Sequence, residues 1–382
     1  MAVPKLRFKE FKDEYISTSI NNIAEITMGQ SPNSVNYTSN TTDIILIQGN
    51  ADLNNGKIQP RLYTTEITKM CEINDIIMTV RAPVGDLAIT EYKACIGRGV
   101  CSIRGSKYLY YYLQNFKYNG EWKKLSKGST IDSITSNDLK NINIILPDKF
   151  EQEKIANFLS LLDKKIELQK QKIDALKIYK IGLFNKIYKE EMKTIKEEEI
   201  KKYAYLQGGY AFKSELVSKK GIPIIRIANI NESIVDLKDI VFYDKEISID
   251  SKFEINTGDI LIAMSGATTG KIGIYKETMK SYLNQRVGKI VLKRKDIVYS
   301  YLYFLFELSS YNMQLNTKLV AGAQPNISPS DIETLKFKVP STEMQEHIAN
   351  MAMNINKKLE IEGNKLQELN KIKKGLLQKM FI

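Results

Sequence analysis

The chain has 382 residues, more than a single hydrophobic core usually serves, so we expect at least two domains. It has no apolar run long enough to span a membrane and no signal-peptide core at its start, so we expect a cytoplasmic protein without a membrane partner. The formal net charge of +12 favours a polyanionic partner, because cationic side chains that neutralise phosphates release counterions.

The first 150 residues have the pattern of a mixed α/β globule. The run INDIIMTVRAPVGDLAI (73–89) consists of short apolar strands that end at a glycine turn, and YLYYYLQNF (108–116) has helical length. A Gly- and Ser-containing loop then leads to a predicted helix N-cap at Ser136. Trp122 is expected in the core. The cysteines lack a CxxC spacing, so we expect neither disulfides nor zinc at Cys71, Cys95 and Cys101.

A long helix follows in residues 151–199. Its apolar residues alternate in steps of four and three, which is typical of a coiled coil, and they are Ile155, Leu159, Leu162, Ile166, Ile173, Leu176, Leu183 and Ile187. Gln169 and Lys180 interrupt this apolar seam. The charged run KEEMKTIKEEEIKK (189–202) is interpreted as a solvated helix end that leads into the second half.

The second half, residues 200–340, repeats the pattern of the first. TGDILIAMSGATTGKIGIY (257–275) parallels 73–89, and YLYFLFELS (301–309) parallels 108–116. The predicted N-cap is Ser330. The closing helix, 341–382, copies the first long helix without a gap at a spacing of 193 positions, so that SDIETLKFKVPSTEMQEHIAN (330–350) matches NDLKNINIILPDKFEQEKIAN (137–157).

The polar interruptions of the two seams predict how the long helices pair. A charge buried alone in such a seam is costly, and a parallel arrangement would place Lys180 beside Lys373. We therefore predict an intramolecular antiparallel pair in which Lys180 meets Glu362 and Gln169 meets Lys373. Two alternatives remain open: each helix packs on its own globular half, or the helices join two chains.

The order of these segments resembles the specificity subunits of type I restriction-modification systems. The resemblance covers the whole chain and includes PKLRFKEF, GDILIAMSGATTGKIGIY, NQRVGKI and the twice-written Pro-x(4)-Gln-Glu-x-Ile-Ala-Asn that opens each long helix. It implies an α+β fold with two α/β target recognition domains, 1–150 and 200–340, whose twisted mixed sheets are separated by two antiparallel coiled-coil helices, 151–199 and 341–382.

The same resemblance implies the partners. Each domain would read one half of a split sequence in double-stranded DNA, and the helical spacer would fix the gap between the halves. The subunit would have no catalytic activity, metal or cofactor of its own. It would dock two methyltransferase (M) subunits that carry S-adenosylmethionine and, through them, the ATP-driven restriction (R) subunits.

Candidate DNA contacts are polar side chains at turns, because these can present hydrogen bonds to base edges. In the first half we select Arg81, Arg98, Arg104, Lys127 and Thr130. In the second half we select Ser265, Thr268, Thr269, Lys271, Asn284, Gln285, Arg286, Gln324 and Asn326.

Three sequence features bear on functions other than DNA recognition. SGATTGK lacks the glycine spacing of a phosphate-binding loop, so nucleotide binding there is rejected. Asp86, Glu91 and Lys93 imitate the acid, acid and lysine of a Mg²⁺-dependent nuclease, which is one alternative function. A helical scaffold with incidental charge is another. The single histidine, His347, aligns with Lys154 and is expected at the surface.

Overall fold

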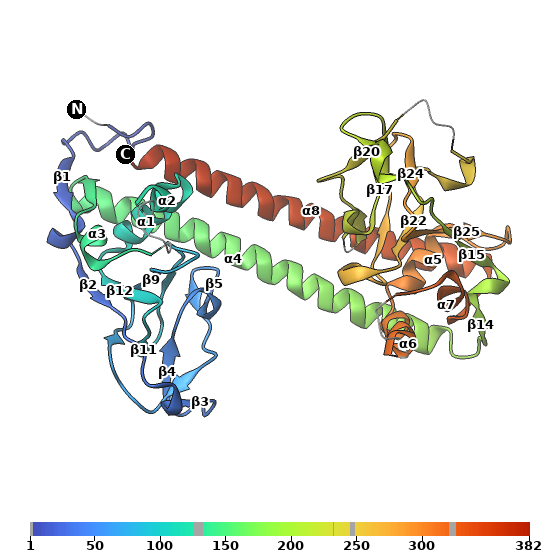
Figure 1. Ribbon diagram of the computed structural model, residues 1–382, viewed down its shortest axis with the longest axis horizontal. Helices are drawn as coiled ribbons and strands as arrows, with labels where there is room; N and C mark the ends of the chain where they lie inside the picture. Colours follow the sequence, from blue (N-terminus) through green and yellow to red (C-terminus); the bar gives the residue numbers. More distant parts are fainter. Residues whose placement is uncertain (1–2, 126–132, 232, 245–248, 321–325) are drawn as a thin grey trace. The chain divides into compact units, whose positions relative to one another are not determined.

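The computed structural model describes residues 3–125, 133–231, 233–244, 249–320 and 326–382 (Figure 1). The chain forms two compact units. Unit 1 contains Met1–Gln171 together with Gly363–Ile382, and unit 2 contains Lys172–Glu362. Each unit combines mixed sheets with helices, in agreement with the predicted α+β class. None of the described helices is both long and apolar enough to cross a membrane.

The described part of unit 1 has a larger and a smaller mixed sheet, and a short sheet in which β1 (Ile16–Ser19) pairs with β13 (Asn143–Leu146). The larger sheet has the order β2 (Glu25–Met28), β12 (Val100–Arg104), β9 (Ile76–Thr79), β10 (Leu87–Ile89), β6 (Lys57–Ile58), β5 (Leu53–Asn54). The smaller sheet has the order β3 (Tyr37–Thr38), β7 (Tyr63–Thr64), β4 (Ile44–Ile47), β11 (Ala94–Ile96), β8 (Met70–Cys71). Within it, β4 and β11 are parallel.

Unit 2 repeats this topology strand for strand. Its short sheet pairs β14 (Glu197–Glu199) with β26 (Lys336–Lys338). Its larger sheet has the order β15 (Ala204–Gly208), β25 (Val287–Leu292), β22 (Ile260–Ala263), β23 (Ile272–Ile274), β19 (Ser233–Val235), β18 (Ile230–Asn231). Its smaller sheet has the order β16 (Val217–Ser218), β20 (Val241–Tyr243), β17 (Ile222–Ile225), β24 (Ser281–Leu283), β21 (Glu254–Ile255), with β17 and β24 parallel. The sequence duplication is therefore a duplication of the fold.

The aromatic stretches are core helices, as predicted. α1 (Lys107–Tyr118) buries its tyrosines from Tyr108 to Tyr112 in the core of unit 1, and α5 (Tyr299–Phe306) buries Tyr301 and Tyr303 in the core of unit 2. Trp122, in α2 (Glu121–Leu125), is 3% exposed and packs edge-on against Phe116, with 4.6 Å between ring centroids. Its predicted place in the core is confirmed.

Two short helices begin one turn before the strands that lead into the long helices, and here the predicted N-caps are wrong. α3 (Ser136–Lys140) is capped by Thr135 and α7 (Pro329–Glu333) by Ser328, rather than by Ser136 and Ser330. Each true cap stands three residues before an aspartate, and the two form a reciprocal capping box. Hydrogen bonds from the cap residue hold the pKa of Asp138, and likewise that of Asp331, below its usual value.

The long helices α4 (Lys149–Lys186) and α8 (Thr342–Met380) form antiparallel segments in each unit, as predicted. The predicted end of the first long helix at residue 199 is wrong, because α4 ends at Lys186, one π-helical turn follows at Ile187–Glu191, and Glu197–Glu199 form the strand β14. In unit 1, Leu159 and Leu377 share a core, and Asp163 forms an ion pair with Lys373 at 2.6 Å. In unit 2, Lys172 forms an ion pair with Glu362 at 3.0 Å, while the later residue Phe184 shares a core with the earlier residues Ile348 and Ala352. In both units, later residues of α4 therefore contact earlier residues of α8, as in an antiparallel pair.

The predicted register of this pairing is wrong. Lys180 forms its ion pair with Glu307, at 2.5 Å, and Glu362 forms its own with Lys172. Lys373 meets Asp163, six positions before Gln169. The seam charges of the two helices do not pair only with each other. Glu307 comes instead from the C-cap of α5 and also accepts a hydrogen bond from Asn356 of α8, so the globular part neutralises the lysine.

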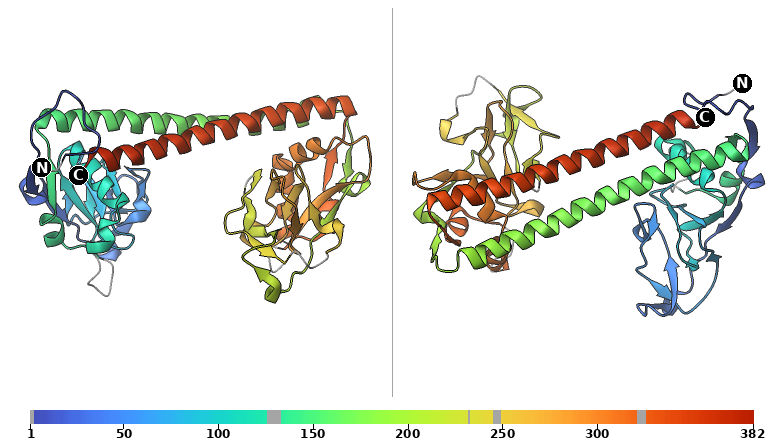
Figure 2. Two further views of the ribbon diagram at one scale, coloured as in Figure 1. Left: turned by 90° about the horizontal axis from the view of Figure 1, so that it is seen from above. Right: turned by 180° about the vertical axis from the view of Figure 1, so that it is seen from behind.

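The N-terminal segment of unit 1 lies against both long helices (Figure 2). The Arg7 guanidinium donates to both carboxylate oxygens of Glu151 in α4, and the Leu6 N–H donates to the Lys379 carbonyl of α8. The Tyr15 hydroxyl also donates to Glu151, at 2.9 Å. Burial and this hydrogen bond raise the pKa of Tyr15, so its phenol keeps the proton it donates. The Glu151 side chain is 0% exposed.

The buried thiols give a simple test of the fold of unit 1. Cys71, Cys95 and Cys101 are free and buried, and burial raises the pKa of Cys71 to about 11 and that of Cys101 to about 12. Since the thiolate is the reactive form, we expect no alkylation of the three residues by iodoacetamide at about pH 8 in the native chain and full alkylation in urea. Intact-mass spectrometry measures both. Rapid native modification of any of them would contradict this core.

Candidate nucleic-acid interface

In unit 1 the ends of several strands gather at one place, which we call strand-end cluster 1 (Gln30, Ser31, Gln48, Val80, Arg81 and Gly97–Gly99). Main-chain hydrogen bonds hold it together. The N–H of Gly97 donates to the Ile47 carbonyl at 2.8 Å, and the N–H of Val80 donates to the Gly99 carbonyl at 2.9 Å. The N–H of Gln30 donates to the Ile96 carbonyl, also at 2.8 Å. The cluster is therefore held together by main-chain hydrogen bonds, which leave most of its side chains unconstrained.

Unit 2 has the same bonds at strand-end cluster 2 (Tyr210, Arg226, Met264, Ser265 and Asn284–Arg286). The N–H of Asn284 donates to the Ile225 carbonyl at 3.2 Å, and the N–H of Met264 donates to the Arg286 carbonyl at 2.9 Å. The N–H of Tyr210 donates to the Leu283 carbonyl at 2.8 Å. Matching these bonds pairs the positions of the two clusters as Gln48 with Arg226, Arg81 with Ser265, Gly97 with Asn284, Arg98 with Gln285, and Gly99 with Arg286.

One glycine in each unit permits this close packing. A Cβ atom on Gly29 would collide with the carbonyl oxygen of Gly97, and a Cβ atom on Gly209 would collide with that of Asn284. Glycine is needed wherever two backbones approach so closely. Both units thus preserve the backbone of the cluster, while the side chains that it carries differ at every paired position above.

Several predicted contact residues lie in these clusters. Arg81, Arg98, Gln285 and Arg286 are exposed, and Asn284 is half-buried. Asn326 is exposed and directly precedes Ile327, whose N–H donates to the Met264 carbonyl of cluster 2. The Ser265 side chain is 8% exposed, and its hydroxyl has no hydrogen-bond partner among the described residues. The sequence therefore identified turns that the fold does bring together.

The remaining predicted residues lie apart from the clusters or are already engaged. Arg104 stands at the far end of β12, roughly 13 Å along the strand from Val100 at about 3.3 Å per residue. It bonds there to Asp75 and Glu25. The hydroxyls of Thr268 and Thr269 donate to main-chain carbonyls, while Lys271 is half-buried and directly precedes β23. Lys127, Thr130 and Gln324 lie outside the described residues.

The fold adds cluster residues that the sequence did not indicate. Gln48 and Arg226 directly follow β4 and β17, the strands that pair in parallel with β11 and β24. Ser31 accepts a hydrogen bond from the Arg98 N–H at 3.1 Å. Their only sequence signal is a polar residue immediately after a short apolar run, which is too common to select them without knowledge of the strand order.

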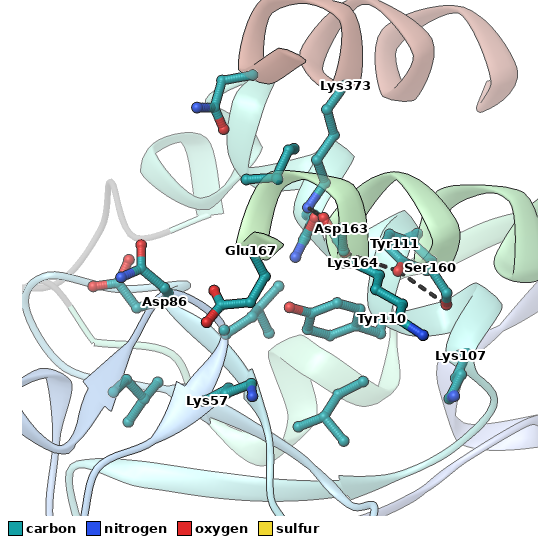
Figure 3. A pocket seen from close by; sticks show the side chains of 18 of the residues that line it. Lys57, Asp86, Lys107, Tyr110, Tyr111, Ser160, Asp163, Lys164, Glu167 and Lys373 are labelled. Atoms are coloured by element: carbon teal, nitrogen blue, oxygen red, sulfur yellow. Dashed lines mark hydrogen bonds and ion pairs between the residues drawn. The ribbon is translucent and has the colours of Figure 1, made fainter. Parts of the chain in front are cut away.

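A pocket of about 850 Å³ lies elsewhere in unit 1, where α4 passes the larger sheet and α1 (Figure 3). Its lining includes Lys57, Lys107, Lys164, Tyr110, Glu91 and Glu167. At the equivalent place in unit 2, Lys276 and Glu360 form an ion pair at 2.6 Å. The corresponding residues in unit 1, Glu91 and Glu167, are both acidic and cannot form that bond. The two units therefore differ at this point.

The geometry does not favour the nuclease alternative. Asp86 forms an ion pair with Lys117, Glu91 pairs with Lys57 at 3.8 Å, and Lys93 pairs with Glu72 at 2.9 Å. The three residues thus have separate partners instead of facing one reaction centre. In the described ranges we find no group of three or more His, Cys, Asp or Glu residues arranged to hold a metal ion.

Similar proteins fit the duplicated architecture. The MjaVIII type I restriction enzyme specificity subunit of Methanocaldococcus jannaschii is 26% identical over 275 residues, which are 67% of this chain and 65% of that relative. The MjaIX specificity subunit of the same organism is 24% identical over 357 residues, 84% of this chain and 81% of the relative. A shorter match, to the provisionally assigned MjaX specificity subunit, has 36% identity and spans 42% of this chain. The chain spans only 39% of MjaX and 65% of MjaVIII.

Solved structures and the family model complete the comparison. The S subunit of a type I restriction-modification system from M. genitalium has the same fold, with a TM-score of 0.63, 18% identity, and coverage of 100% of this chain and 99% of that one. The family model of the type I restriction modification DNA specificity domain matches residues 12–178 and again residues 180–371. The chain therefore belongs to the type I restriction modification DNA specificity family and carries its characteristic domain twice.

Proposed function

We propose that the chain is a specificity subunit that binds double-stranded DNA and recognises a split, asymmetric sequence, with one half read by each unit. The observation that carries this proposal is the pair of strand-end clusters. The two clusters have the same main-chain arrangement but carry different hydrogen-bonding side chains. Two units with the same fold would therefore select different bases. The net charge of +12 would supply attraction to phosphates that does not depend on sequence.

The proposal assigns roles along the chain. Residues 1–150 and 200–340 are the target recognition domains, and β14 (Glu197–Glu199) belongs with the second of them through its pairing with β26. The spacer helices, α4 and α8, account for most of residues 151–199 and 341–382. Within the recognition domains the contacts come from the strand-end clusters and Asn326. Arg104 is left out because two carboxylates already bind its guanidinium.

The chain would act as the non-catalytic member of a larger cytoplasmic assembly. Two M subunits would bring S-adenosylmethionine, and ATP-driven R subunits would join through them. Apolar side chains exposed on the outer face of α4 offer a docking surface for an M subunit, and they are Phe150, Phe158 and Leu161.

Selection from a pool of random DNA duplexes tests the proposal with the full-length chain. At about 0.1 M salt we expect enrichment of one split sequence whose two conserved halves flank an unconserved gap. Binding should weaken steeply as salt rises, because phosphate contacts release counterions. Absence of any enriched sequence would contradict the proposal and favour the scaffold. Mg²⁺-dependent cutting by the purified chain, abolished by Asp86→Ala, would instead reveal a nuclease.

A further inference from the structure

The two strand-end clusters carry the same two side-chain types in exchanged positions. In unit 1 a glutamine, Gln48, follows β4, and an arginine, Arg98, follows the parallel neighbour β11 by two residues. In unit 2 an arginine, Arg226, follows β17, and a glutamine, Gln285, follows β24 by two residues. The equivalence rests on matched main-chain hydrogen bonds from Gly97 to Ile47 and from Asn284 to Ile225.

Arginine and glutamine are the side chains with the best-defined preferences for bases. Arginine makes a bidentate contact with the O6 and N7 atoms of guanine, whereas glutamine makes one with the N6 and N7 atoms of adenine. Neighbouring strands lie about 4.8 Å apart, and base pairs rise about 3.4 Å along one DNA strand. Side chains that project from adjacent strand ends can therefore reach neighbouring base pairs.

The exposed arginine of unit 1 and the exposed glutamine of unit 2 are available for such contacts. Arg98 and Gln285 are exposed, and their own N–H groups are fixed by hydrogen bonds to the Ser31 hydroxyl and the Tyr210 carbonyl. Both residues thus have a rigid backbone beneath a free side chain. In the described structure, neither guanidinium nor amide is committed to a protein partner at these two positions.

The residues that follow β4 and β17 are held more firmly. Gln48 is half-buried beside Ser31, with 3.5 Å between its amide oxygen and the serine hydroxyl. Arg226 donates one Nη2 hydrogen to the Asp239 carbonyl at 2.8 Å, which orients the guanidinium and leaves the Nη1 group uncommitted. Asp239 itself lies in the left-handed region, with a φ of 54°, which aspartate adopts more readily than most residues.

We propose that each unit reads one guanine and one adenine in neighbouring base pairs through this arginine–glutamine pair. In unit 1 the adenine faces the end of β4 and the guanine the end of β11, whereas in unit 2 the guanine faces the end of β17 and the adenine the end of β24. Arg98 and Arg226 contact the guanines, and Gln48 and Gln285 contact the adenines. This inference rests on the proposed function and adds to it the identity of two base pairs in each half.

Exchanging the exposed members of the pairs tests the inference in the duplex selection described above. Arg98→Gln should convert one G·C pair of one half-site to A·T, beside an A·T pair that does not change. Gln285→Arg should convert one A·T pair of the other half-site to G·C, beside an unchanged G·C pair. At each altered position the variant should bind the new base pair about tenfold or more tightly than the original one, as expected for a bidentate contact.

Matched controls separate base reading from charge. Arg294→Gln removes the same charge from an exposed arginine that bonds Asp296, and Gln171→Arg adds one on α4; both should leave the selected sequence unchanged. Arg98→Lys keeps the charge without the bidentate fork and should weaken the preference for guanine at that position.

The outcomes distinguish the inference from the function beneath it. If the unaltered chain selects no split sequence, the proposed function fails. If it selects one, but Arg98→Gln and Gln285→Arg only weaken binding to the same sequence, these residues contact phosphates and the inference is overturned. A change of base at positions that are not flanked by the required A·T or G·C neighbour overturns it as well.

Discussion

Exchanging residues 16–146 for the corresponding segment of another specificity subunit is expected to replace one half of the recognised DNA sequence and leave the other half intact. The expected effect is all-or-none at the exchanged half, because strand-end cluster 1 lies entirely inside the segment. The exchange begins and ends on the paired strands β1 and β13, so both new junctions fall beside each other in one short sheet. It also retains the Arg7–Glu151 bond outside the segment.

The matched exchange in unit 2 covers residues 197–338, between the paired strands β14 and β26. It should change the other half-site only. Methylated sequences read from the host genome, or duplex selection with the purified chains, report both results. Modular reading would be refuted if either exchange altered both halves, or if a folded exchanged chain kept the original sequence.

The largest stability effect is expected at Glu151. Glu151→Ala leaves the Arg7 side chain, which is 14% exposed, without its carboxylate. Breaking a buried ion pair from one side typically costs about 3–5 kcal/mol, and we expect about 3 kcal/mol here because the arginine is only partly buried. The single tryptophan of the chain, Trp122, lies in the core of unit 1, so its fluorescence follows the unfolding of this unit. Urea titration followed by tryptophan fluorescence should show the decrease in the free energy of unfolding.

Two variants make this measurement specific. Glu153→Ala removes an exposed carboxylate from the same helical turn and should change the unfolding free energy by less than about 0.5 kcal/mol. Arg7→Met combined with Glu151→Leu removes both charges and should lose less stability than Glu151→Ala alone, because no uncompensated charge stays buried. Equal losses for Glu151→Ala and Glu153→Ala would show that the N-terminal segment contributes little to unit 1.

Much of the fold was predictable because it follows from the local spacing of apolar residues along the sequence. The alternating four- and three-residue spacing of α4 and α8 and the repeat at 193 positions indicated two long helices within one duplicated chain, and the polar interruptions of the seams indicated that they run antiparallel. The pairing register was not predictable, since Lys180 is neutralised by Glu307, which lies 127 positions away outside the helices. No helical periodicity reveals a partner from another element.

The candidate site was predictable only in part, for a topological reason. Arg81, Arg98 and Gln285 lie in turns that flank strong strand signals, so the search for polar turns found them. Gln48 and Arg226 gain their meaning from the parallel pairing of β4 with β11 and of β17 with β24. The paired residues are 49 positions apart in unit 1 (Leu46 and Cys95) and 58 apart in unit 2 (Ile224 and Tyr282), and short strands of this kind carry no sequence signal for their neighbours.

The main-chain support of the strand-end clusters has a consequence for how such proteins diversify. Because the scaffold is closed by peptide groups and by the close approach at Gly29 and Gly209, exposed positions such as Arg98 and Gln285 can be substituted without changing it. Gly99 is an exception, since a Cβ atom there would collide with the Gln48 carbonyl oxygen. Under the proposed function, single codon changes at such exposed positions would alter the sequence preference while leaving the main-chain hydrogen bonds in place. Gene duplication followed by independent drift of the two copies would then suffice to create an asymmetric target from an originally palindromic one.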